Sequence, residues 1–357
     1  MSNEKQYASV RYLFRHGENI LDYKKILDGI NRSLECIKEE ERKPIIQEII
    51  LAALNAVDPY ECVSSSIKKD ESAINIKNKA YNLYEYKNIY LISIGKAALP
   101  MAKAIQDKIG EHITEGVVVT KTITQEFNVD LGKSIKILLG GHPIPNQSSI
   151  NCSKVITKLL KRSKKDDLVI FLISGGASAL ITAPRNNISL GDLQGLTKTL
   201  FACGADIGEI NSLRKHLDLV KGGGLVRMAY PAKSVTLVLS DVIGNPLDII
   251  ASGPTVADKT TFKDAYDVIK KYDLEKSIPG SILNTLQDGL KGKIPDTIKA
   301  GEKCLEITDN IVIASNLTAA KNARMDALKK KFSSQIYTTY LSGEANHIGF
   351  FLSCLTK

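Results

Sequence analysis

The chain has 357 residues, of which 43% are hydrophobic and 24% are charged, a composition that is ordinary for a globular protein of one large or two modest domains. No run of about 18 apolar residues occurs, which excludes a membrane-spanning helix. The six cysteines lack CxxC spacing, so the sequence predicts neither a disulfide framework nor a zinc site. The N-terminal segment mixes basic with acidic side chains and makes a poor targeting signal, so we expect a cytoplasmic protein, with the mitochondrion as the alternative.

The net charge of +9 is compatible with three kinds of partner: nucleic acid, an acidic membrane surface or a small anionic substrate. The lysine-rich stretches 161–165 and 329–331 are short and fall where helices are expected to end, where Lys complements the helix dipole. No RNP, zinc-finger or basic-heptad pattern accompanies them. We therefore expect a small-molecule ligand and neither nucleic acid nor membrane as partner, and we leave a homo-oligomer open.

Strand and helix patterns alternate along the chain. A helical pattern over 45–57 ends at Asp58-Pro59. The polar, lysine-rich stretch 64–88 that follows is expected to form a surface excursion. Short apolar runs rich in β-branched residues then predict strands at 89–94, 116–120, 135–139, 168–173, 235–239 and 311–314. Helical patterns lie between most of these runs, at 96–109, 148–160, 190–202, 213–228 and 318–331.

The strand runs are continuously apolar and do not alternate with polar residues, which is typical of strands buried on both faces. The pattern therefore predicts an α/β fold with a mostly parallel, Rossmann-like, three-layer sheet. We expect an N-terminal domain over 1–260, with a poorly ordered lead over 1–25. The helix-rich stretch 262–290 marks a change of subdomain, and we assign 261–357 to this segment and to the incomplete start of a second α/β domain.

The candidate functional residues lie where the predicted strands end, because ligands bind beyond the carboxyl ends of strands in open parallel sheets. The segment Ser174-Gly175-Gly176-Ala177-Ser178 follows a buried strand. Its glycines permit close approach of the backbone to a ligand, and its N–H groups can form an anion nest. The other interpretation is a tight turn that needs positive φ.

Lys96 follows the strand over 89–94 and precedes a predicted helix. A lysine at a helix N-terminus is electrostatically misplaced, which makes it a functional candidate. An exposed lysine that extends into water is the other interpretation. Asp241, at the end of another strand, could hold Mg²⁺ or orient a hydroxyl, or it could cap a turn. His142, in the loop after the strand over 135–139, is interpreted as a loop-fixing residue in preference to a catalytic one.

A basic cluster forms the last group of candidates. Arg214 and Lys215 follow Asn211, and Lys221 precedes a glycine triplet. Arg214 and Lys221 lie seven residues apart, so one helix face could carry both. Arg offers a two-pronged donor for carboxylate or phosphate, whereas a basic solvated helix is the alternative. Together the candidates point to an anionic small molecule and to phosphoryl transfer, although neither a Walker motif nor the protein-kinase motifs are present.

At these same positions the sequence resembles the glycerate 2-kinase family, whose members carry a C-terminal MOFRL domain. Seven blocks match in order, at 94–98 with 101–102, 141–145, 173–180, 211–217, 220–223, 239–244 and 250–255. The resemblance implies ATP and Mg²⁺ as cofactors and transfer of the γ-phosphoryl group to a hydroxyl of D-glycerate, giving 2-phosphoglycerate. It also implies a cleft between two α/β domains.

The resemblance puts the family's catalytic lysine on Lys96 and implies that 174–178, Arg214, Lys215 and Lys221 line the same cleft. From chemistry we assign Lys96 to the charge of the transferred phosphoryl group and Arg214 to the substrate carboxylate. We expect Asp241 to be catalytic and to act as the metal ligand.

The sequence departs from the family pattern in two ways. Ala177 stands where the family usually has a third glycine, and it would distort the turn if that position needs positive φ. The chain also ends before the expected GGE and GGRNQE segments, so we expect a truncated isoform with weak or no turnover. One alternative is a non-catalytic isoform that binds nucleotide, glycerate or a full-length partner. The other is a hydroxypyruvate reductase, disfavoured because no GxGxxG follows a strand.

Overall fold

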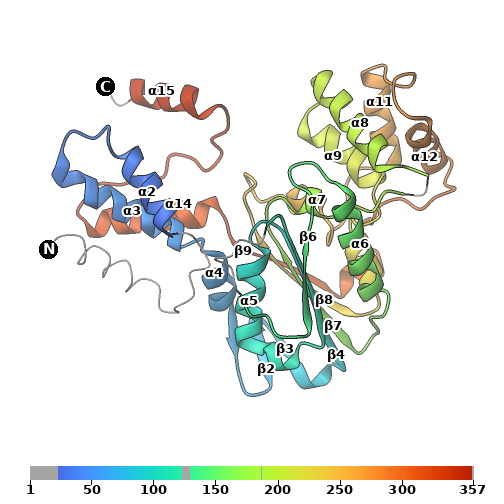
Figure 1. Ribbon diagram of the computed structural model, residues 1–357, viewed down its shortest axis with the longest axis horizontal. Helices are drawn as coiled ribbons and strands as arrows, with labels where there is room; N and C mark the ends of the chain where they lie inside the picture. The colour runs from blue at the N-terminus through green and yellow to red at the C-terminus, as the bar shows by residue number, and fades with distance from the viewer. Residues whose placement is uncertain (1–22, 123–128, 186, 356–357) are drawn as a thin grey trace.

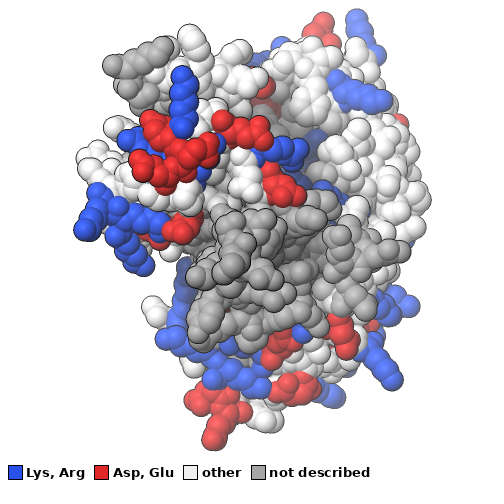
Figure 2. All heavy atoms as spheres, turned by 60° about the vertical axis from the view of Figure 1, so that its left-hand side comes forward, with Lys and Arg blue, Asp and Glu red and all other residues white. Residues whose placement is uncertain are grey.

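The computed structural model describes residues 23–122, 129–185 and 187–355 (Figure 1). The lead expected over 1–25 lies almost wholly outside these ranges. No helix in the described part of the chain is long and apolar enough to cross a membrane. On the side of the molecule shown in Figure 2, Lys and Arg lie in small groups next to Asp and Glu, so the positive charge does not gather into one stripe there.

Six parallel strands form the central sheet, in the order β6-β5-β4-β7-β8-β9. Every predicted strand is present within three residues of its expected start. The prediction of an α/β fold with a parallel sheet is therefore confirmed. The strands are β4 (Asn88–Ile94), β5 (Glu115–Thr120), β6 (Ile135–Leu139), β7 (Asp167–Ile173), β8 (Lys233–Leu239) and β9 (Thr308–Ala314).

Helices cover both faces of the sheet and gather in two lobes beyond it (Figure 1). The main helices are α2 (Tyr23–Ser33), α3 (Lys43–Asn55), α4 (Pro59–Ser66), α5 (Ala98–Ile109), α6 (Gln147–Leu160), α8 (Leu190–Ala202), α9 (Ile207–His216), α11 (Phe262–Lys271), α12 (Gly280–Leu290), α14 (Asn316–Lys329) and α15 (Ala345–Leu355). The shorter ones are η1 (Glu40–Arg42), η2 (Leu83–Glu85), η3 (Gly110–His112), α7 (Ala177–Leu180), α10 (Gly224–Ala229), η4 (Ile250–Ser252) and α13 (Lys303–Glu306).

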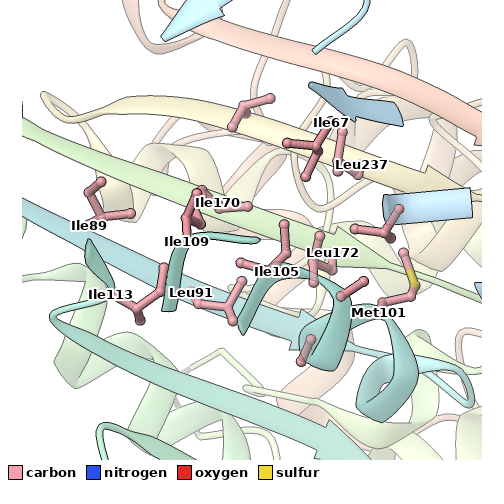
Figure 3. Close-up of a cluster of buried hydrophobic side chains, with 14 of the residues drawn as sticks. Ile67, Ile89, Leu91, Met101, Ile105, Ile109, Ile113, Ile170, Leu172 and Leu237 are labelled. Carbon is pink, nitrogen blue, oxygen red and sulfur yellow. The ribbon is translucent and has the colours of Figure 1, made fainter. Parts of the chain in front are cut away.

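Each face of the sheet has its own hydrophobic core, because neighbouring residues of a strand point to opposite faces. Leu91 and Leu172 pack with side chains of α4 and α5 on one face, in the cluster of Figure 3. Ile92 and Phe171, one position away, pack with side chains of α6 and α10 on the other face. Burial on both faces explains why the strand sequences are continuously apolar.

The lobe formed by α8, α9, α11 and α12 has a separate core (Figure 1). The change of subdomain expected at 262–290 corresponds to α11 and α12. These helices pack with α8 and α9, which precede them by about 60 residues in the chain. After this lobe the chain returns to the central sheet, where β9 pairs with β8. The domain boundary at residue 260 stays a prediction.

The prediction of one continuous helix over 213–228 is wrong. Helix α9 ends at His216, and α10 starts at Gly224. Between them Gly222 and Gly223 adopt positive φ values of 53° and 81°, which an α-helix cannot contain. The helical spacing of apolar residues therefore continued across a break that the glycine triplet imposes.

The stretch 64–88 contains three short antiparallel strands, β1 (Ile67–Lys69), β2 (Ala73–Ile76) and β3 (Lys79–Asn82). Side chains of this small sheet are buried in the core on the α5 face, among them Ile74 and Tyr81. The Tyr81 hydroxyl donates a hydrogen bond to Asp309 of β9 over 2.7 Å. The stretch expected as a surface excursion is thus attached to the main core through alternate residues of β2.

We expect Leu172→Ala to lower the free energy of unfolding by about 2–5 kcal/mol, because a fully buried leucine at the centre of the sheet leaves a cavity when it is truncated. Urea unfolding followed by circular dichroism measures the change. Leu290→Ala at the exposed end of α12 is the matched control and should change stability by no more than about 0.5 kcal/mol. Equal losses for the two variants would contradict the assignment of the core.

Candidate functional site

A pocket of about 430 Å³ lies beyond the carboxyl ends of β4, β7, β8 and β9. This is the edge of a parallel sheet where ligands bind. Its lining joins the turns after four strands to the ends of two helices from the N- and C-terminal parts of the chain. The lining residues are Val57, Lys96, Ala97, Ser174, Gly175, Leu239, Ser240, Asp241, Ser315, Asn316 and Ala319.

The glycine turn after β7, residues 174–178, is the centre of this site. At Gly175 an added Cβ atom would lie 1.9 Å from Asp241 Oδ2. At Gly176 it would lie 3.1 Å from His142 Nε2 and 3.2 Å from Lys96 Cε. Candidate side chains from three other loops therefore occupy the space that side chains of the turn would need. The glycines are required by this close approach as well as by the φ of 87° at Gly176.

Hydrogen bonds fix the turn against the segment that carries Lys96. The Lys96 amide donates to the Gly175 carbonyl over 2.9 Å, and the Ala97 amide donates to Ser174 Oγ over 3.1 Å. Gly95 has a φ of 140°, and a Cβ atom there would overlap Ser174 Oγ at 2.0 Å. The two strand ends are thus bound to each other before any ligand is present.

Ala177 causes no distortion of this turn. It is the first residue of α7, is almost fully buried, and is not among the residues with positive φ. The residue that does adopt the left-handed conformation is Gly176, the N-cap of α7. An alanine is therefore tolerated at position 177, and the cost considered for it in the sequence does not arise.

The charged side chains in the pocket are not neutralised by one another. Lys96 and Asp241 are exposed, and neither makes an ion pair or a side-chain hydrogen bond with any residue in the described ranges. Burial, together with the charges of Lys96 and Lys121, holds the pKa of His142 below its ordinary value. The imidazole is therefore neutral at pH 7.

Lys215 and Lys221 do not line the pocket. The Lys215 ammonium is buried 2.5 Å from Asp258, and the Lys221 ammonium is buried 2.5 Å from Asp218. Lys221 also donates to the carbonyl of Ile181. The idea that Arg214 and Lys221 share a helix face is wrong, because α9 ends between them.

Arg214 differs from these lysines. It lies half-buried in the last turn of α9 and makes no hydrogen bond or ion pair with the residues that the structure describes. Burial lowers the pKa of its guanidinium, with no carboxylate to oppose the effect. Asn211 lies one turn earlier on α9 and is buried. Arg214 is thus a partly desolvated cation available to an anion, although it lies outside the lining of the pocket.

The remaining predicted residue, Ser178, has a partner on η4. Its hydroxyl lies 2.9 Å from the hydroxyl of Ser252. Helix α9 also contacts η4, so this short helix lies between the glycine turn and the helix of Arg214. The structure therefore gathers Lys96, Ser174, Gly175 and Asp241 in one pocket with Gly176 beside it, and links Ser178 toward α9.

Sequence reasoning did not propose Ser315 and Asn316 as site residues. They follow β9 and begin α14, in the same position relative to their strand as Lys96 and Asp241. That position was the available signal, because a strand end in a parallel sheet faces the ligand edge. Val57, from the end of the α3 segment, offered no such signal.

Asp241 is the residue that fits a metal ion. Within the described ranges no group of three or more His, Cys, Asp or Glu side chains could hold one. Mg²⁺, however, is bound by one or two carboxylates together with water and substrate phosphates. An exposed carboxylate in a pocket open to a ligand meets this requirement, so the residues present are compatible with Mg²⁺.

We expect Lys221→Met to lower the free energy of unfolding by about 3–5 kcal/mol, because it leaves the Asp218 carboxylate buried without its counter-charge. The double variant with Asp218→Asn should lose less than the two single variants together. Urea unfolding of all four proteins measures the coupling. Lys165→Met, at an exposed position, is the control. If Lys221→Met lowers the free energy of unfolding no more than Lys165→Met does, the ion pair is dispensable.

The Asp258 carboxyl should make stability depend on pH. Burial opposes its ionisation, but the Lys215 ammonium and hydrogen bonds from Thr260 outweigh burial and lower the pKa of Asp258. Its stabilising contribution is therefore complete above the unfolded value of about 3.9 and is lost as the pH falls through the lower folded value. Urea midpoints below about pH 4 should fall less steeply for Asp258→Asn than for the wild type, with Asp166→Asn as control. Parallel curves for wild type and Asp258→Asn would refute this.

Comparison with known proteins places this chain in a family. The family model described as "Domain of unknown function (DUF4147)" matches residues 45–287. The glycerate 2-kinase of Pyrococcus horikoshii is 38% identical over 305 residues, which are 85% of this chain and 67% of the relative. A putative hydroxypyruvate reductase of Agrobacterium vitis is 38% identical over 259 residues, 72% of this chain and 56% of that protein.

The crystal structure of glycerate kinase from Thermotoga maritima superposes with a TM-score of 0.73 at 33% identity, over 88% of this chain and 69% of that one. The chain thus spans about two thirds of the length of these microbial kinases. The chain therefore belongs to the DUF4147 family, and in sequence and fold it is similar to glycerate kinases.

Proposed function

We propose that this chain is a glycerate 2-kinase, which transfers the γ-phosphoryl group of ATP to the 2-hydroxyl of D-glycerate. The observation that carries the proposal is the meeting of Lys96 and Asp241 on the glycine turn, within one pocket at the ligand edge of the sheet. Phosphoryl transfer needs little covalent chemistry from a protein and depends on positioning and on neutralising charge. An unpaired cation and an unpaired carboxylate, held beside the glycine turn, are suited to both tasks.

In this proposal Lys96 neutralises the charge on the transferred phosphoryl group. Its ammonium extends from the turn after β4 into the pocket and has no carboxylate partner among the residues that the structure describes. Its full charge is therefore available to the oxygens of a phosphate. The glycine turn brings this lysine to the phosphate site, because without Cβ atoms at 175 and 176 the Lys96 and Asp241 side chains reach the turn together.

Arg214 is proposed to bind the carboxylate of glycerate. A guanidinium is costly to bury without an anion, and Arg214 is half-buried with no anionic partner in the described ranges. A carboxylate accepts two parallel hydrogen bonds from it. The Ser178 and Ser252 hydroxyls and Asn211 lie on the elements between the turn and this arginine, and they are candidates to orient the substrate.

Asp241 is proposed to hold Mg²⁺ together with the nucleotide phosphates. Bound Mg²⁺ would neutralise charge on the β- and γ-phosphates. The side chain lies against Gly175 from the turn after β8, so its carboxylate is directed to the same turn as Lys96. Lys215 and Lys221, which the resemblance also assigned to the cleft, are proposed to act indirectly. The Lys215–Asp258 ion pair ties α9 to a neighbouring loop, and Lys221, paired with Asp218 in its own turn, donates to the Ile181 carbonyl.

A reductase is the second candidate, because one relative is named a putative hydroxypyruvate reductase. The turn after β7 reads Ser-Gly-Gly-Ala-Ser and lacks the GxGxxG spacing of dinucleotide sites. The kinase proposal is therefore preferred. Oxidation of NADH in the presence of hydroxypyruvate would support the reductase instead.

The kinase proposal predicts ATP- and Mg²⁺-dependent formation of 2-phosphoglycerate by the purified chain, measured by ³¹P NMR. Lys96→Met should reduce the rate by about 10²–10³-fold, the usual cost of losing one donor to transition-state charge. Binding of ATP–Mg²⁺ and D-glycerate is measured in parallel by calorimetry, so that slow turnover is separated from absent binding.

Lys103→Met is the matched control for Lys96. Lys103 lies on α5, two turns away from the pocket, and pairs with Asp107. It should keep the wild-type rate. If Lys96→Met were as active as Lys103→Met, or if the wild type bound neither ligand, the proposed function would be wrong.

A further inference from the structure

His142 is a side chain of the site that the proposed chemistry has not used. It follows β6 through Gly140 and Gly141 and lies against the glycine turn, with Nε2 and Cδ2 about 3 Å from the point where Gly176 would carry a Cβ atom. Lys96 Cε is equally close to that point. The imidazole and the Lys96 side chain therefore lie at the same side of the turn, whereas Asp241 lies against Gly175.

The loop of His142 is held in place without its imidazole. The Gly140 amide donates to the Thr120 carbonyl over 2.9 Å, and the Gly141 amide donates to Ser149 Oγ over 3.0 Å. Beyond the histidine, Gln194 donates to the Pro145 carbonyl over 2.8 Å. The ring nitrogens of His142 make no hydrogen bond with the residues that the structure describes. A histidine whose purpose is to fix the loop would use them.

The surroundings of the ring favour its neutral, proton-accepting form. Lys96 approaches from the turn after β4, and Lys121 from the end of β5. Both are cations, and with partial burial they hold the pKa of His142 below its ordinary value. A neutral imidazole that carries its proton on Nδ1 offers Nε2 as an acceptor.

We propose that His142 is the general base of the transfer, with Nε2 accepting the proton of the substrate hydroxyl. This inference rests on the proposed kinase function. In the step, the O–H bond of glycerate breaks and its proton passes to Nε2. The hydroxyl oxygen forms a bond to the γ-phosphorus as the bond between that phosphorus and the β,γ-bridging oxygen breaks, and ADP leaves with that electron pair. The imidazolium then returns its proton to solvent.

The kinetic test compares His142→Gln with the wild type across pH. In the wild type kcat/KM should fall as the pH drops through the pKa of the imidazole, below its ordinary 6.5. In His142→Gln, kcat/KM should be lower by about 10²-fold, and its fall at low pH (the acid limb) should be absent. His112→Gln is the control and should keep the wild-type profile, because the His112 ring packs edge-to-face against Tyr84, away from the pocket. An acid limb that persists in His142→Gln, or that disappears in Asp241→Asn instead, overturns the proposal.

A second test needs no turnover. The Cε1–H resonance of His142 is identified by NMR as the one missing from His142→Gln, among the five histidines of the chain. It should titrate at higher pH in Lys96→Met, because a neighbouring positive charge has been removed. It should also shift on addition of D-glycerate, while the His112 resonance stays unmoved.

The two tests separate this inference from the proposed function. A His142 resonance that responds to D-glycerate in a chain without turnover supports the contact and counts against the kinase activity of this chain. A resonance that responds neither to glycerate nor to Lys96→Met overturns the assignment, whatever the rate of the wild type.

Discussion

The site depends on the close approach of three loops to a turn that has no side chains at its centre. Gly175 and Gly176 leave room for Asp241, Lys96 and His142 to reach the backbone after β7. The same loops are fixed by hydrogen bonds between strand ends, such as that from the Lys96 amide to the Gly175 carbonyl. The parallel sheet makes this possible, because it brings the ends of β4, β6, β7 and β8 to one edge although they are distant in sequence.

The sheet and much of the site could be predicted from the sequence. Strands buried on both faces leave a continuous apolar pattern, and a parallel sheet directs the residues after each strand to a common edge. Lys96, Ser174 and Asp241 were found by that rule. The break between α9 and α10 was missed because apolar spacing continues through it, and the left-handed conformation of Gly222 and Gly223 is decided by their contacts with other segments.

Whether a basic residue faces a ligand or a buried carboxylate could not be predicted from its position. Lys215 and Arg214 are neighbours on α9, yet Lys215 pairs with Asp258, 43 residues away, and Arg214 has no partner in the described ranges. The carboxylate that pairs with Lys215 is brought to it by tertiary structure, whereas Asp218, which pairs with Lys221, lies three residues before it. Composition and spacing describe all these cations alike, so a basic cluster in the sequence contained both structural ion pairs and free charge.

The packing of α14 on α3 has a consequence for how the chain folds. These helices are separated by more than 250 residues. Asn316, the first residue of α14, and Val57, two residues after the end of α3, both border the pocket. Contacts between segments so distant in sequence slow folding, because much loop entropy is lost before they form. During synthesis the first helices leave the ribosome long before their partner exists. Their apolar surfaces therefore stay exposed, or are covered by chaperones, until β9 has joined the sheet and α14 has packed on α3.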